Sequence, residues 1–159
     1  MPSFRKPKGV RALSTGDRFY ANIASASGVV AAVGGKDGQV SLYNDAQLGE
    51  WFFVYSISPI SGLGLLAYYF QVAGTSGANQ GGAFPIVSGN PTPLGQIYTA
   101  NVAQIVPGPG VTFPFLQEFS QSGGNWQAAP LAVVKPGYSL IVQSAGDLEC
   151  TFGYVVIGN

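Results

Sequence analysis

The sequence contains no histidine, a single cysteine and few charged side chains: only 9% of its 159 residues are Asp, Glu, Lys or Arg. Average soluble proteins carry about 25%. Without histidine, the usual Ser-His-Asp and Cys-His catalytic arrangements and most transition-metal sites cannot form. The lone Cys150 excludes an intrachain disulfide and is typical of a small packing residue. These absences predict a protein that is not an enzyme and holds no cofactor or metal.

Long hydrophobic runs are also absent. The longest, such as LGLLAYYF at 63–70, fall well short of the ~20 residues that a membrane-spanning helix needs. The N-terminal residues lack the apolar core of a secretory signal, so we expect synthesis in a reducing cytoplasm and no membrane partner. Hydrophobic residues nevertheless make up 47% of the chain, with 23 glycines. Such a composition does not indicate disorder, and the length suits one domain with its own core.

The few carboxylates offer weak candidates for chemistry. Asp147 and Glu149 are two residues apart, so they would point the same way at a solvated hairpin end. Asp37 in GGKDG and Asp45 after an asparagine are expected to shape turns. The stretch GLGLLA at 62–67 matches a dinucleotide fingerprint in letters, but a β-type run follows it where that motif requires a helix.

Short β-rich runs separated by Gly, Pro, Asn and Ser fill most of the chain, and no helical period of useful length appears. This pattern predicts an all-β sandwich or barrel. We expect one domain, residues 18–159, preceded by an extended arm, residues 1–17. The predicted strands are 18–24, 28–33, 39–43, 51–58, 63–72, 96–101, 111–116, 130–134, 138–143 and 148–157.

Two of these strands carry the clearest patterns. In 148–157 the period of two puts the larger apolar residues and Cys150 on one, inward face. In 63–72 both faces are apolar, and a strand of that kind needs a cover on its outer side. A neighbouring subunit is the simplest cover. We therefore expect a homo-oligomer, a trimer, with Leu66, Tyr68 and Phe70 at the interface.

The basic residues gather at the N-terminus. Five of the seven lie in residues 1–18 against one acid, a net charge of +4, whereas residues 19–159 carry −4. Pro2, Pro7 and Gly9 prevent a regular helix there. The simplest interpretation is a solubilising tail. Nucleic acid is not expected as a partner, because so few cations would give only a weak contact with it. The sharper interpretation is an arm that docks on an acidic protein surface through an apolar anchor and four cations: Phe4, Arg5, Lys6, Lys8 and Arg11.

Two segments resemble known families. VKPGYSLIVQSAGDLECTFGYVVIGN (134–159) has the layout of the last two strands of a jelly roll, and it is similar to the trimeric tumour-necrosis-factor-like jelly rolls, with Phe152, Gly153 and Tyr154 in the matching place. GGKDGQVSLYNDAQLGEWFFVYSISPI (34–60) resembles small structural proteins of tailed bacteriophages. The resemblance implies a protein of the virion that decorates a capsid or associates with a tail. It brings no catalytic or binding residues.

The sequence therefore predicts a jelly-roll-like antiparallel sandwich that acts as a non-catalytic structural protein of a phage virion. It would decorate or stabilise the capsid or tail as a homo-oligomer, with the major capsid protein or other virion proteins as partners of its arm. The alternative is a trimeric receptor- or glycan-binding head whose tips use loops 75–82, 88–95 and 122–127, where Trp126 could stack on a sugar.

Overall fold

The computed structural model describes residues 23–46, 49–61, 65–72, 77–85, 94–103, 115–118 and 130–158. Within these ranges every regular element is a strand, and no helix is present that could cross a membrane. The predicted arm and Trp126 lie outside them. The strands are β1 (Ile23–Val30), β2 (Lys36–Tyr43), β3 (Glu50–Ser61), β4 (Leu65–Val72), β5 (Ala78–Gly82), β6 (Phe84–Pro85), β7 (Gln96–Ala103), β8 (Phe115–Glu118), β9 (Ala132–Val134), β10 (Tyr138–Ser144) and β11 (Leu148–Gly158).

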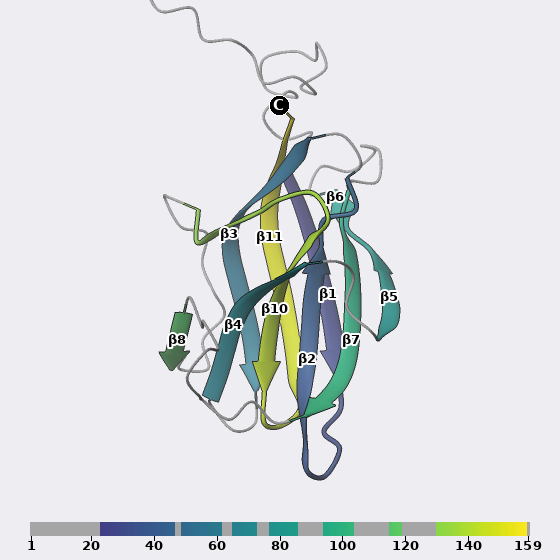
Figure 1. Ribbon diagram of the computed structural model, residues 1–159, viewed down its shortest axis with the longest axis vertical. Helices are drawn as coiled ribbons and strands as arrows, with labels where there is room; N and C mark the ends of the chain where they lie inside the picture. Colours follow the sequence, from purple (N-terminus) through teal and green to yellow (C-terminus); the bar gives the residue numbers. More distant parts are fainter. Residues whose placement is uncertain are drawn as a thin grey trace, which may run out of the picture.

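These strands form two antiparallel sheets that pack face to face (Figure 1). Sheet A has five strands in the order β6-β1-β11-β3-β9, and sheet B has six in the order β5-β7-β2-β10-β4-β8. The predicted all-β sandwich is confirmed. Its strand order is jelly-roll-like, because the pairs are nested: β4 with β8, β3 with β9, β2 with β10 and β1 with β11. Such nesting is what one long hairpin produces when it is rolled into two sheets.

The segment between β4 and β8 adds strands beyond this nested set. β7 and β5 extend sheet B past β2, while β6 extends sheet A past β1. Between β5 and β6 lies Ala83, which is buried and donates its N–H to the Gly95 carbonyl at 3.2 Å. The chain from 78 to 85 therefore passes from one sheet to the other and joins them along one side of the sandwich.

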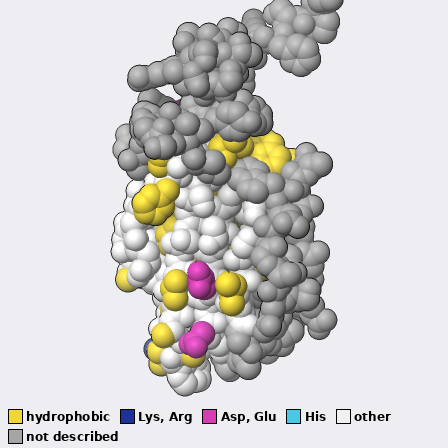
Figure 2. Space-filling model, turned by 180° about the vertical axis from the view of Figure 1, so that it is seen from behind, with side chains coloured by type: hydrophobic (Ala, Val, Ile, Leu, Met, Phe, Trp, Pro, Cys, Tyr) yellow, Lys and Arg dark blue, Asp and Glu magenta, His cyan; other side chains and the backbone are white. Residues whose placement is uncertain are grey.

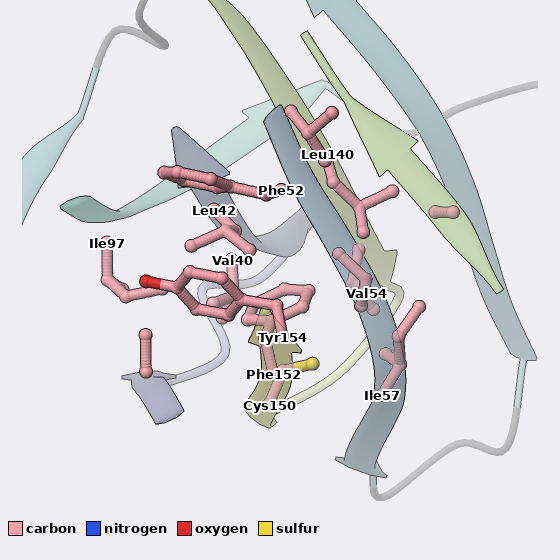
Figure 3. Packing of buried hydrophobic residues seen from close by; sticks show 14 of the residues in the cluster. Val40, Leu42, Phe52, Val54, Ile57, Ile97, Leu140, Cys150, Phe152 and Tyr154 are labelled. Atoms are coloured by element: carbon pink, nitrogen blue, oxygen red, sulfur yellow. The ribbon is translucent and has the colours of Figure 1, made fainter. Parts of the chain in front are cut away.

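The core lies between the two sheets, and β11 supplies its centre. Leu148, Cys150, Phe152 and Tyr154 are at most 1% exposed, which confirms the predicted inward face of this strand. Figure 3 shows Cys150, Phe152 and Tyr154 among the side chains of β2 and β3: Val40, Leu42, Phe52 and Val54. The rings of Phe52 and Tyr154 stack with centroids 4.8 Å apart.

Two predicted strand boundaries are wrong. Residues 18–24 and 28–33 were expected as separate strands, but β1 runs unbroken through Gly28. A Cβ at Gly28 would lie 2.7 Å from Ile97 Cγ2, so this glycine permits a close approach of the sheets and does not end the strand.

The end of the predicted strand 51–58 is the second wrong boundary, because β3 continues through Pro59 to Ser61. Pro59 lies opposite Cys150 of β11, whereas β9 pairs with β3 only over Phe52–Val54. In the described residues the Pro59 end of β3 thus has a ladder on one side only. A proline, which cannot donate to a ladder, is tolerated in such an edge position.

Candidate interaction surfaces

A buried asparagine organises one end of the sandwich. Asn44, fully buried, donates from Nδ2 to the carbonyls of Glu50 and Val134, both at 2.9 Å, and its Oδ1 accepts the Ala46 N–H at 3.0 Å. This side chain ties the end of β2 to β3 and β9. The following residue, Asp45, is half-buried and accepts the Gly95 N–H at 2.8 Å. The loop that leaves β2 is therefore fixed against the start of β7.

A tyrosine–amide cluster lies beside this loop, on the strands β5, β7 and β2 of sheet B, which Figure 1 shows side by side. Its members on β7 alternate with the buried Ile97, so they lie on the outer face of the sheet. Tyr43 and Tyr98 are half-buried, and their ring centroids are 6.2 Å apart with an angle of 75° between the planes. Asn79 donates from Nδ2 to Gln96 Oε1 at 3.3 Å, and Gln96 Nε2 lies 3.4 Å from Asp45 Oδ2. We use the name tyrosine–amide cluster for these five residues: Tyr43, Asp45, Asn79, Gln96 and Tyr98.

Strand register explains why the cluster comes together. Tyr43 is opposite Gln96 in the β2–β7 ladder, and Tyr98 is opposite Asn79 in the β7–β5 ladder. Residues that face each other across a ladder share one face of the sheet. The sequence placed Asn79 in the possible recognition loop 75–82 but did not predict that part of this loop forms β5. The two glycines and two amides of ANQGG gave no strand signal.

The outer face of sheet A is mostly uncharged (Figure 2). One row across it holds Val29, Glu149 and Ile60 side by side on β1, β11 and β3. Figure 2 shows an acidic side chain between two hydrophobic ones at this place. Val29 is 61% exposed and Ile60 55%, and Phe84 on β6 reaches 69%. We call the row of Val29, Glu149 and Ile60 the sheet A row.

The predicted paired carboxylates lie at this end of sheet A. Asp147 and Glu149 are both exposed, as expected of a hairpin end, and Asp147 accepts a hydrogen bond from the Ala32 N–H. In the part of the chain that the structure describes, no three His, Cys, Asp or Glu side chains gather where they could hold a metal ion.

Asp37 is not the turn residue that the sequence predicted. The turn of GGKDG lies at Gly34 and Gly35, and β2 has already begun at Lys36. Asp37 is buried in β2, where it accepts a hydrogen bond from Gln143 Nε2 at 2.8 Å. β2 and β10 are buried on both faces over most of their length. A charged residue in a glycine-rich stretch is typical of a turn. Only the pairing of β2 with β10 brings the buried amide of Gln143 to the Asp37 carboxylate.

Tyr68 and Phe70, two of the predicted oligomer residues on β4, differ in their exposure. Tyr68 is 3% exposed and belongs to the hydrophobic core, where burial raises the pKa of its phenol. Phe70 is 39% exposed, and Leu66 lies opposite Ser144 in the β4–β10 ladder. The burial of Tyr68 does not support an interface role. The sequence could not show this, because both faces of β4 are apolar and the pattern does not distinguish the inner face from the outer one. The homo-oligomer itself stays a prediction.

Several predicted residues lie outside the described part of the chain: Phe4, Arg5, Lys6, Lys8, Arg11 and Trp126. Their roles in docking and recognition stay predictions. Cys150 is fully buried, and burial together with the nearby Glu149 carboxylate raises the pKa of its thiol, so it is the packing residue that the sequence indicated.

Comparison with protein-family models, with curated proteins and with solved structures found no match to this chain.

Proposed function

We propose that this chain is a non-catalytic structural protein of a phage virion, which decorates or stabilises the capsid or tail as a homo-oligomer. The proposal draws on the resemblance of two sequence segments and on the jelly-roll-like sandwich. The observation that carries it is the outer face of sheet A, where large hydrophobic side chains are exposed among few charges. Exposed apolar side chains grouped on one face favour contact with another protein.

The sheet A row sets the chemistry of that contact. Val29 and Ile60 are already partly covered, so burying the rest of each would stabilise a complex by about 1–2 kcal/mol. Glu149 lies between them, and a buried carboxylate without a partner would cancel this gain. The partner surface must therefore bring a cation to Glu149. The N-terminal arm, with four cations and Phe4 in residues 4–11, has the matching composition.

Light scattering of the purified protein tests the oligomer. We expect a mass above that of one chain at micromolar concentration. Ile60→Lys should lower it, because the change removes an apolar contact and its ammonium would pair with Glu149 in place of the partner's cation. Ile60 is exposed, so the monomer should unfold at an unchanged urea midpoint. A matched control is Ser58→Lys, on the same face and two residues away along β3. A wild-type protein with the mass of one chain would overturn the prediction of a homo-oligomer.

Docking through the arm has a separate test. Deleting residues 2–11 should leave thermal unfolding of the sandwich nearly unchanged and should sharply reduce incorporation into particles. Replacing Arg5, Lys6, Lys8 and Arg11 with Gln should do so in part, most visibly at low salt, because exposed ion pairs are individually weak and high salt already screens them in the wild type. Full incorporation of the truncated protein would leave the arm as a solubilising tail.

The second candidate function is a receptor- or glycan-binding head. The tyrosine–amide cluster favours it, because aromatic rings grouped with amides and a carboxylate are the combination that carbohydrate recognition uses.

A further inference from the structure

We propose that the tyrosine–amide cluster binds a neutral glycan. This inference rests on the second candidate function, for which it names the site and the class of ligand. It does not depend on the structural role, since a decorating protein and a receptor-binding head could both use such a surface. It rests on which groups sheet B brings together: two tyrosine rings on β2 and β7, two amides on β7 and β5, and the Asp45 carboxylate beside them.

The rings supply the apolar half of the recognition. The C–H face of a pyranose ring packs on an aromatic face, and tyrosine adds a hydroxyl that can bond to the sugar. The planes of Tyr43 and Tyr98 meet at 75°, so the two rings form the walls of a corner. Both rings are half-buried, which leaves part of each exposed while packing holds it in place.

The polar groups supply the other half. A sugar hydroxyl both donates and accepts, so it pairs well with an amide, which does the same, and with a carboxylate, which accepts. Asn79 and Gln96 are bonded to each other, and Gln96 also lies within 3.4 Å of Asp45. Each amide nitrogen has a second hydrogen, and each carboxylate oxygen has a further lone pair, so the chain of three side chains retains capacity for a ligand.

The cluster is also held in place before any ligand arrives. Asn79 Oδ1 accepts the Gly81 N–H at 2.7 Å, and Asp45 Oδ1 accepts the Gly95 N–H at 2.8 Å. Four of the five residues lie on paired strands. Fixed side chains lose little conformational entropy on binding, and this lowers the cost of holding a flexible sugar.

Charge points to a neutral ligand. The cluster contains one carboxylate and no Lys or Arg. A phosphate, a sialylated or sulfated sugar or a nucleic acid would meet a negative charge without a cation to offset it. Neutral hexose or N-acetylhexosamine units satisfy the same hydrogen bonds without that repulsion.

The test is binding of the full chain to an array of neutral hexose and N-acetylhexosamine oligosaccharides, followed by titration of the strongest ligand. We expect Tyr98→Ser to weaken binding about tenfold and Tyr98→Phe, which keeps the ring, to retain most of it. Asn79→Ala changes an exposed side chain, so it should weaken binding without affecting unfolding. Thr151→Ala, on the outer face of sheet A, is the control and should bind like the wild type.

Each other outcome counts against the inference. It is overturned if no neutral oligosaccharide on the array binds, or if binding survives both Tyr98→Ser and Asn79→Ala. Loss of binding in Thr151→Ala would move the site to the opposite sheet. The oligomer mass of Tyr98→Ser should equal that of the wild type, so failure of glycan binding and failure of the oligomer are read separately.

Discussion

Gly95 and Tyr154 form a tight contact whose energy can be measured. The Tyr154 hydroxyl donates to the Leu94 carbonyl at 2.6 Å, and the adjacent Gly95 has a φ of +120°. A Cβ at position 95 would overlap the Tyr154 hydroxyl oxygen and would lie 3.1 Å from its Cζ. We expect Tyr154→Phe to cost about 1–2 kcal/mol, because it removes the hydrogen bond to a carbonyl at the edge of the core.

Gly95→Ala should be more damaging. A side chain in this backbone region costs about 1–3 kcal/mol, and forcing a methyl group against the hydroxyl adds about 1–3 kcal/mol. In the double variant the oxygen is absent, so part of the overlap is relieved. The ring carbon and the Phe52 ring, 3.3 Å from the added Cβ, still crowd it. The double variant should therefore be about 1–2 kcal/mol more stable than the sum of the two single effects predicts.

Urea unfolding of the four proteins, followed by tyrosine fluorescence or circular dichroism, gives the coupling energy. The slope of free energy against urea should stay constant, since the surface exposed on unfolding does not change. Effects that add to within about 0.5 kcal/mol would refute the reasoning, because they would mean that the methyl group and the hydroxyl do not compete for one space.

Three further predictions concern buried groups. Cys150 should react with a thiol reagent such as DTNB only after unfolding, because it is fully buried and its thiol pKa is raised; fast labelling of the native protein would contradict this. Burial also raises the pKa of Tyr68 and Tyr154 above the ordinary phenol value of about 10, so in the folded state they stay neutral when the unfolded chain ionises. The free energy of unfolding should accordingly fall as pH rises above about 10, by about 1.4 kcal/mol per pH unit for each tyrosine, and urea midpoints that do not change with pH would contradict it. Asn44→Ala should lower the free energy of unfolding by about 2–4 kcal/mol, since it leaves the carbonyls of two strands without a donor; a thermal scan that matches the wild type would show that water replaces the amide.

Alternation along the chain predicted the fold class and the interior well, and β11 shows why. The two-residue alternation of side chains along this strand places Cys150, Phe152 and Tyr154 on one face, and that face is the buried one. Where both faces are apolar, as at Tyr68 on β4, the pattern carries no information about which side is inward. The same limit applies to Gly28, which reads as a break in sequence and is a point of close sheet contact in the fold.

The tyrosine–amide cluster could not be predicted from the sequence. Tyr43, Asn79 and Gln96 come from positions up to about fifty residues apart, and their meeting depends on the register of β2, β7 and β5. Register is a property of pairs of strands, and no single strand encodes it. The amides of β5 also have low β propensity, so their strand forms because β7 offers an edge.

The nesting of strand pairs has a consequence for biosynthesis. β11 lies between β1 and β3 in sheet A, and its ladder with β1 joins Ile23–Val30 to a strand that begins at Leu148. At the usual translation rate of about 5–20 residues per second, β1 is complete on the order of ten seconds before its partner exists. During that interval Phe52 and Val54 of β3 also lack the strand that packs beside them. The nascent chain must be kept from pairing elsewhere throughout this time, and folding of sheet A can be completed only after β11 has left the ribosome.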